Sequence, residues 1–337
     1  MIPLDAFLPQ GEAIAALKRQ IRENRLTHAL LISGEAGVGK WTLARTAAAA
    51  LLCEGDPTGP RPCGACRACE QMENLSHPDL IVMQKGEPLA PTETKTVIPV
   101  TDVEEMIRRL SLRGFQNDRH CVIIRHAEDM NEAAQNKLLK TLEEPPEGTF
   151  FLLTCVHTER LLPTIVSRCR PLKLHAWPAE SVAGVLRDHG FAGEKAAEAV
   201  RESGGSFGRA LRMMEDEDYW TFRAEAIRDF LGCERRSDIF SIAARWKDRK
   251  GETDALFSVL ESVFSRMMRT SLGIAGAGEK IPDCPEKWQR FAARAGAEDY
   301  VKVLDALSLA RKRTMSSVPF QAAAEQLILS LMEAVDR

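Results

Sequence analysis

A phosphate-binding loop between an apolar run and a helical pattern constrains the fold of this chain more than any other feature. The segment 34–40 reads Gly-Glu-Ala-Gly-Val-Gly-Lys and matches the pattern G-x-x-x-x-G-K completely. It follows the apolar run 29–32 and precedes a helical pattern over 42–47. There, backbone N–H groups and a helix N-terminus can cradle phosphates, which predicts a nucleotide-binding α/β fold. The candidate phosphate-loop residues are Gly34, Gly37, Gly39, Lys40 and Thr42.

The helix side of this loop lacks the hydroxyl that should contact Mg²⁺. The position after Lys40 should be Ser or Thr, but it is Trp41. Thr42 lies about 100° further round the helix and is not expected to replace the hydroxyl. Tight binding of ATP with Mg²⁺ is therefore not expected. Lys40 itself is left with two interpretations, a phosphate contact or a solvated lysine without a ligand.

The strand side of the expected metal site is also altered. An ATPase of this kind carries carboxylates at the end of a second apolar strand, where they hold the metal and position water. The best candidate strand, 121–124, ends in Arg125 and His126 instead. Glu128 and Asp129 follow, and they are expected to cap or begin the next helix. Positive charge at Arg125 would repel the metal, so we interpret the chain as a nucleotide-binding fold without hydrolysis.

Composition and charge limit the classes of protein considered. The chain has 337 residues, 45% of them hydrophobic and 28% charged, which is typical of a soluble protein of two or three domains. Its formal net charge of −3 gives no general attraction to nucleic acid. No stretch approaches the ~18 apolar residues of a membrane span, and the segment 1–7 has no signal-peptide pattern. We expect a cytoplasmic protein with reduced cysteines.

Four cysteines are concentrated in one segment rich in Gly and Pro. Three of them are spaced every third residue, so a tight turn can direct their thiols to one point, and a fourth completes a tetrahedron suited to Zn²⁺. Four protein ligands leave no open position, which predicts a structural metal site. An iron–sulfur cluster and four unliganded thiols are the alternatives. The candidate ligands are Cys53, Cys63, Cys66 and Cys69.

The remaining pattern predicts three domains. Residues 1–175 alternate between helices and short apolar strands, as in a parallel sheet that is covered on both faces. Residues 176–214 indicate a small helical unit, and 215–337 are helical throughout, with apolar stripes that are more typical of core than of interface. The expected strands are 28–33, 79–84, 120–124, 149–155 and 171–174.

Several motifs resemble one family over essentially the whole chain. The segment 138–146 reads Leu-Leu-Lys-Thr-Leu-Glu-Glu-Pro-Pro, and 167–169 reads Ser-Arg-Cys. The segments 28–34 and 77–80, together with the cysteine insertion 53–69, fit the same pattern. By these motifs the chain resembles the delta-prime subunits of the bacterial DNA polymerase III clamp loader, which belong to the AAA+ class.

The resemblance implies an AAA+ domain with a zinc module, a helical lid, and an all-helical collar that joins five subunits in a ring. The implied partners are the gamma/tau and delta subunits, with the sliding clamp and primer–template DNA reached through the complex. Motor subunits of this class hydrolyse ATP, whereas delta-prime typically does not. Motors also carry a sensor arginine where this chain has Gly208, and Arg209 is one residue off. The family assigns Arg168 as an arginine finger acting in trans on a neighbour.

Three functions remain after this comparison of motifs. The first is a subunit without hydrolysis that helps to load the clamp and supplies Arg168. The second is an active DNA-dependent ATPase motor resembling gamma or tau, which positions 41, 125, 126 and 208 disfavour. The third is a zinc-dependent DNA-binding module, for which Arg61 and Arg67 alone give too little positive charge. Any polymerase activity would belong to the holoenzyme.

Overall fold

The computed structural model describes residues 2–90, 96–111, 119–273, 281–314 and 318–335, and these form two compact units, 1–177 and 178–337. The first unit ends two residues later than expected, because Trp177 packs beneath the phosphate loop. Its indole Nε1 donates to the carbonyl oxygen of Val38 at 2.9 Å, and its ring meets Phe7 edge to face. The expected boundary at 214/215 lies inside the second unit.

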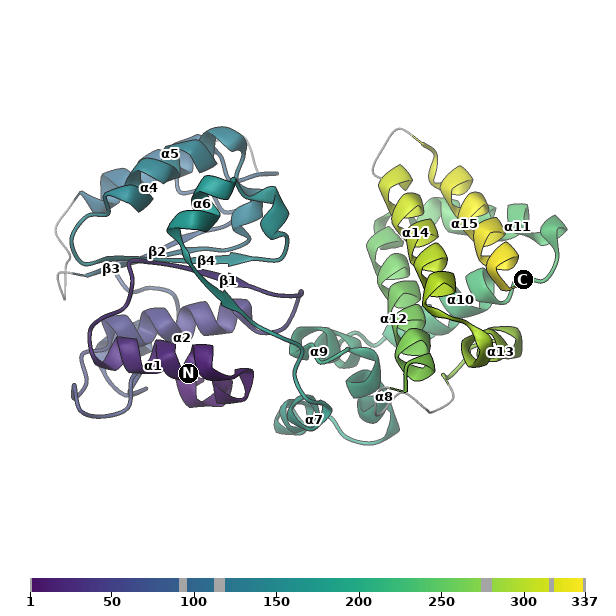
Figure 1. The fold of residues 1–337 in the computed structure, drawn as a ribbon, viewed down its shortest axis with the longest axis horizontal. Helices are drawn as coiled ribbons and strands as arrows, with labels where there is room; N and C mark the ends of the chain where they lie inside the picture. Colours follow the sequence, from purple (N-terminus) through teal and green to yellow (C-terminus); the bar gives the residue numbers. More distant parts are fainter. Residues whose placement is uncertain (1, 91–95, 112–118, 274–280, 315–317, 336–337) are drawn as a thin grey trace. The chain divides into compact units, whose positions relative to one another are not determined.

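The first unit is a three-layer α/β structure around a five-stranded sheet of order β2-β3-β4-β1-β5. All the strands are parallel, and each lies within one residue of its expected range. Helices α1 and α2 cover one face and α4, α5 and α6 the other (Figure 1). The strands are β1 (Ala29–Ser33), β2 (Leu80–Met83), β3 (His120–Ile124), β4 (Thr149–Cys155) and β5 (Arg170–Lys173).

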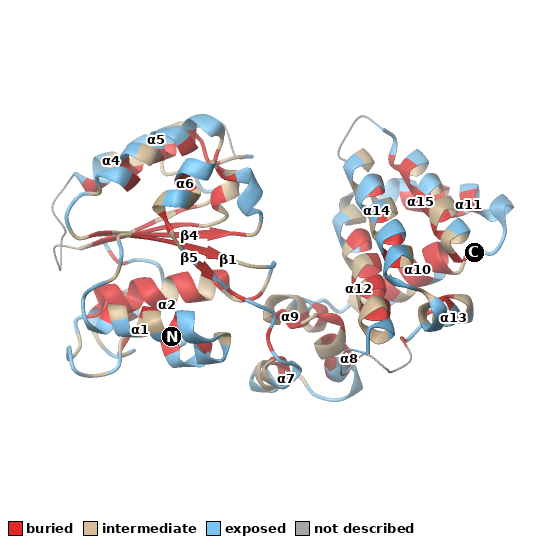
Figure 2. Ribbon diagram, viewed as in Figure 1, coloured by how far each residue is buried: buried red, intermediate tan, exposed pale blue. Residues whose placement is uncertain are grey.

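The helices of this unit form where apolar residues recur at helical spacing. In α1, Ile14, Leu17 and Ile21 are buried on one side, while the other side is exposed (Figure 2). The three inner strands β1, β3 and β4 are buried almost throughout, since both faces of the sheet are covered, whereas the edge strands β2 and β5 are partly exposed. The helices are α1 (Glu12–Arg22), α2 (Lys40–Leu52), α3 (Arg67–Glu73), α4 (Val100–Leu110), α5 (Glu132–Glu143) and α6 (Pro163–Arg168), with short 3-10 turns η1 (Leu4–Gln10), η2 (Ala127–Asp129) and η3 (Thr158–Arg160).

The second unit is all-helical in its described residues, and a large apolar core gathers buried side chains of α10 to α15. Trp246 and Trp288 are almost fully buried, and the indole Nε1 of each finds an acceptor, Asp229 Oδ2 and the Leu231 carbonyl respectively, at 2.9 Å. The apolar stripes predicted as core are buried, apart from Trp220, which is half-buried. The elements are α7 (Ala179–Asp188), α8 (Glu194–Glu202), α9 (Phe207–Glu215), α10 (Tyr219–Leu231), η4 (Arg236–Asp238), α11 (Ile239–Trp246), η5 (Lys247–Glu252), α12 (Thr253–Ser271), α13 (Glu286–Arg294), α14 (Ala297–Thr314) and α15 (Phe320–Val335).

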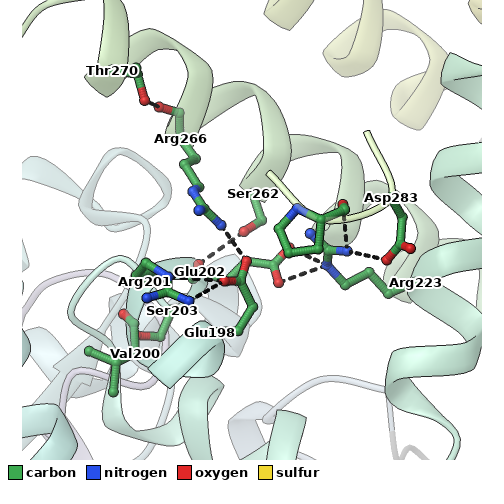
Figure 3. Close-up of polar contacts among 11 residues, drawn as sticks. Glu198, Val200, Arg201, Glu202, Ser203, Arg223, Ser262, Arg266, Thr270 and Asp283 are labelled. Carbon is green, nitrogen blue, oxygen red and sulfur yellow. Dashed lines mark hydrogen bonds and ion pairs between the residues drawn. The ribbon is translucent and has the colours of Figure 1, made fainter. Parts of the chain in front are cut away.

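A buried network of charges joins α8 to α10 and α12 (Figure 3). Both carboxylate oxygens of Glu202 lie 2.8 Å from Nε of Arg223, and each of these two side chains is 1% exposed. Glu198, one turn earlier on α8, pairs with Arg266 of α12, whose side chain is 2% exposed. Ser262 Oγ adds a hydrogen bond of 2.9 Å to the Glu202 carbonyl. Helix α8 is therefore fixed to the following helices by ion pairs as well as by packing.

No helix in the described part of the chain is long and apolar enough to cross a membrane.

Candidate functional site

The phosphate loop lies at the carboxyl end of β1, which pairs with β4 and β5 in the sheet, and leads directly into α2. Gly34 must be glycine, because a Cβ there would lie 2.5 Å from the carbonyl oxygen of Leu174. Gly39 adopts a left-handed conformation with φ of 98°, which turns the chain into the helix that begins at Lys40. The sequence-predicted loop is thus a real strand–loop–helix junction, with its backbone held close by the chain after β5.

Lys40 is not the solvated lysine of the second interpretation, because it is only 6% exposed. Its Nζ donates to the carbonyl oxygens of Gly34 at 2.7 Å and Glu35 at 2.6 Å. Burial lowers the pKa of the Lys40 ammonium, and the Glu128 carboxylate opposes that shift. The ammonium is therefore folded back onto its own loop, where its charge is balanced by two carbonyls and a nearby carboxylate.

The two replaced metal-site positions contact each other. The guanidinium carbon of Arg125 lies 5.2 Å from the ring centroid of Trp41, and that of Arg45 lies 5.9 Å from the same ring. Arg125 Nη1 also donates to Gln84 Oε1 at 3.1 Å. An indole offers no oxygen ligand and a guanidinium repels a cation, so this pair does not fit Mg²⁺. Thr42, half-buried on α2, does not alter that donor set.

Glu128 lies in the 3-10 turn η2 after β3, in line with the expectation that it begins the next helix, but its part in this site was not predicted. Asn131, not Glu128 or Asp129, caps α5, since Asn131 Oδ1 accepts from the Ala134 N–H at 2.8 Å. The Glu128 side chain is 5% exposed and its Oε1 accepts from the Val156 N–H at 2.8 Å. Burial favours its neutral form, but His126 and the Val156 N–H outweigh burial and lower the pKa of Glu128 to about 2. An ionised carboxylate therefore lies near Lys40.

Its place could have been anticipated from topology, because Glu128 follows β3 at the sheet edge where β1 also ends. His126, the second replaced position, has a left-handed backbone with φ of 52°, and its N–H donates to Thr154 Oγ1 at 3.1 Å. Its ring Nδ1 lies 3.6 Å from Glu128 Oε1. The single carboxylate here is already engaged by a backbone N–H and a histidine, and it has no second acidic partner on β3.

Four thiols converge in the segment between α2 and α3. Their sulfur atoms all lie within 4.8 Å of one another, and this set could hold a metal ion. The pairs Cys53–Cys66 and Cys63–Cys69 are each 3.9 Å apart, close to the ~3.8 Å between sulfurs at tetrahedral Zn–S distances. Backbone N–H groups point at two of the sulfurs, and backbone hydrogen bonds lower the pKa of the Cys63 thiol to about 6, whereas burial raises the pKa of the Cys53 and Cys69 thiols. The donor set fits a thiolate-bound ion.

Arg168 ends the short helix α6 and lies at the surface, with 34% of its side chain exposed. Its Nη1 donates to the Thr164 carbonyl at 3.0 Å, and its Nη2 forms an ion pair with Glu143. None of these contacts involves the phosphate loop of the same chain. The structure therefore brings Lys40, Trp41, Arg125 and Glu128 together but gives Arg168 separate partners.

The motif around Gly208 lies at the start of α9 in the second unit. Ser206 caps this helix, since its Oγ accepts from the Arg209 N–H at 3.2 Å. Gly208 therefore lies in the first turn and provides no side chain. Arg209 Nη2 lies 3.4 Å from Ser258 Oγ on α12, so this arginine is directed to a neighbouring helix of its own unit.

The chain is similar to one family of known proteins over half of its length. The family described as "DNA polymerase III, delta subunit" matches residues 9–178, half of the chain. The chain belongs to this family. Its curated relatives identify it more closely as a delta-prime-like clamp-loader subunit. The relative from Bacillus subtilis, DNA polymerase III subunit delta', is 26% identical over 96% of each chain. The Escherichia coli subunit delta' is 35% identical over 57% of this chain and 56% of its own length.

Subunits named tau or tau/gamma are also similar to this chain. DNA polymerase III subunit tau/gamma of Haemophilus influenzae is 36% identical over 50% of this chain and 23% of its own length. Among solved structures, a gamma subunit-related protein of Thermotoga maritima has a TM-score of 0.47 at 18% identity, covering 95% of this chain and 99% of that one. So distant a structural likeness carries no functional information. These similarities do not show whether the chain hydrolyses ATP, so that question depends on the site residues.

Proposed function

We propose that this chain is a clamp-loader subunit that does not hydrolyse ATP. The contact between Trp41 and Arg125 carries this proposal, because it occupies the two positions where a motor would hold Mg²⁺. Catalysis of phosphoryl transfer depends on the metal to neutralise charge on the β- and γ-phosphates. The Arg125 guanidinium supplies a fixed positive charge instead, and Lys40 is already engaged by its own loop. The proposed place of action is the cytoplasm, at replicating DNA.

The second part of the proposal is that Arg168 acts in trans. A guanidinium that is permanently charged and partly exposed can reach a γ-phosphate bound by a neighbouring motor subunit. Such a group stabilises charge that develops in the transition state, which is where electrostatic catalysis is most effective. The proposed partners are gamma/tau and delta in a five-subunit ring, with the sliding clamp and primer–template DNA bound by the complex.

Reconstitution of the complex tests both parts. We expect the isolated chain to release no phosphate from ATP, with or without DNA. Arg168→Ala should leave folding and complex assembly intact, yet slow DNA-stimulated turnover of the loader by 10-fold or more, the order expected for an arginine finger. Arg168→Lys is the matched variant, which keeps the charge but loses the planar fork. Unchanged turnover for Arg168→Ala in an assembled complex would exclude the trans role.

An active motor subunit is the alternative, and the similarity to subunit tau/gamma is the observation that favours it. A motor would turn over ATP as an isolated chain or with DNA, and Lys40→Ala would abolish that turnover. We regard positions 41, 125, 126 and 208 as the residues that oppose this alternative. If the wild-type chain hydrolyses ATP and Lys40→Ala does not, the motor assignment is correct.

We further propose that the four cysteines bind a structural Zn²⁺. A zinc ion with Cys53, Cys63, Cys66 and Cys69 as ligands would have no open coordination position and therefore no catalytic role. When bound, the ion cross-links the segment before α3, which has few apolar side chains of its own. Its proposed role is to fold this segment against α2 and α3.

A further inference from the structure

We propose that Glu143 is a positioning residue that holds Arg168 in a resting place and releases it to the neighbouring nucleotide. This inference rests on the proposed trans role of Arg168. The Glu143 carboxylate pairs with Nη2 of Arg168, while Nη1 of the same guanidinium donates to the Thr164 carbonyl at 3.0 Å. Two of the donors that a phosphate would need are therefore engaged, one by a carboxylate and one by the backbone.

The backbone of both partners is well anchored, although the side chains are exposed. Glu143 is the last residue of α5, where Leu142 is buried and its carbonyl oxygen lies 3.0 Å from Nε2 of His28. Pro145 and Pro146 follow and end the helix. On the other side, Ile165 buries α6 against the core of the first unit. The carboxylate and the guanidinium thus meet because two fixed helix ends present them to each other.

The ion pair between Arg168 and Glu143 is weak enough to form and break reversibly. The Arg168 and Glu143 side chains are 34% and 48% exposed, so water screens their attraction. Exposed ion pairs of this kind contribute little to stability, so little is lost when the pair separates. A γ-phosphate carries more charge than a carboxylate and can accept two parallel N–H bonds from a guanidinium. Glu143 and an incoming phosphate therefore compete for the same donor, and the phosphate is the stronger partner.

Glu143→Gln removes the charge and keeps the shape of the side chain. In the reconstituted loader we expect this variant to lower the KM for ATP by about 2- to 5-fold, as loss of an exposed ion pair implies, with kcat within about 2-fold. Glu144→Gln is the matched control, because Glu144 is the adjacent exposed carboxylate. In an Arg168→Ala background the Glu143→Gln effect should disappear, which a merely structural role of Glu143 would not predict.

A second measurement needs no partner subunit. Phenylglyoxal modification of Arg168 in the isolated chain, followed by peptide mass spectrometry, should become about 2- to 5-fold faster in Glu143→Gln and stay unchanged in Glu144→Gln. An unchanged modification rate in Glu143→Gln overturns the inference. An unchanged KM for ATP in Glu143→Gln also overturns the inference. If Arg168→Ala slows turnover in that case, the trans role of Arg168 stands. If Arg168→Ala has no effect, the proposed function fails and the regulatory role of Glu143 fails with it.

Discussion

At the scale of single residues, Trp41 and Arg125 compensate each other. Either change alone would place an unusual side chain beside a phosphate loop, a bulky indole or a guanidinium without an aromatic partner. Together they form a cation–π contact, with Gln84 accepting a hydrogen bond from the arginine. The site that would hold a metal in a motor is thus a small, self-consistent cluster of side chains.

A double-mutant cycle should detect this coupling. Trp41→Ala and Arg125→Ala should each destabilise the first unit, but the double variant should lose less than the sum of the two by about 0.5–1 kcal/mol. Urea unfolding of the full chain measures the three free energies. The pair Trp41 and Arg45 is the control, because its longer separation of 5.9 Å should give a smaller coupling. Additive losses for Trp41 and Arg125 would show that the contact contributes nothing.

The sequence was sufficient to find these residues but not their contact. A motif defines what position 41 or 125 should be, so a replacement is visible by inspection. The meeting of the two side chains depends on the strand order, which sets the end of β3 near the start of α2. The part of Glu128 in this site was missed for the same reason. The sequence shows that Glu128 follows a strand. The direction of its side chain depends on the left-handed backbone at His126, which no residue pattern predicts.

At the scale of elements, the strands were predictable because each is a short apolar run between polar segments. Helix ends were predicted less well. Apolar spacing predicts this helix from Val103, whereas α4 begins three residues earlier, at Val100, directly after Pro99 at its N-cap. The cysteine segment has no periodicity at all, and its shape follows from its glycines and thiols. Gly55 is the clearest case, since a Cβ there would lie 2.9 Å from Cys63 Sγ and 3.4 Å from Cys53 Sγ.

Gly55→Ala should therefore weaken metal binding without removing a ligand. We expect about 10- to 100-fold lower affinity for Zn²⁺, the usual range for a disturbed surrounding of a metal site. Competition with a chromophoric chelator measures the affinity, and hydrogen exchange over 53–69 should rise when the chelator removes the ion. Gly59→Ala is the control, because a Cβ there would lie no nearer than 3.4 Å to any atom. Equal affinities for the two variants would contradict a thiolate-bound ion at this point.

At the scale of the whole molecule, the chain forms two compact units, and the predicted division of the second unit at 214/215 stays a prediction. The change from mixed to purely helical pattern near 178 was visible as a loss of apolar strand runs. The sequence pattern does not predict the buried pairs that Glu198 and Glu202 form with two arginines. Charged residues are expected at the surface unless a partner for them is known. The helical segment 178–214 therefore packs as part of a larger unit, through residues that sequence alone assigns to its exterior.

Cutting the chain at the expected boundary should expose this dependence. A fragment 178–337 should unfold cooperatively in urea. A fragment 215–337 should be less stable by several kcal/mol, since a buried ion pair that loses one partner costs about 3–5 kcal/mol. Circular dichroism and tryptophan fluorescence report on both fragments. Equal midpoints and equal slopes for the two would mean that α7, α8 and α9 contribute nothing to the core beneath them.

The paired charges under α8 have a further consequence for warm conditions. The hydration of charged groups becomes less favourable as temperature rises, so the dehydration cost of burying Glu202 and Arg223 falls on heating. The stabilisation per unit of buried apolar surface meanwhile reaches a plateau. The contact of α8 with α10 and α12 should accordingly retain a larger fraction of its stabilising free energy at high temperature than an apolar contact of equal area.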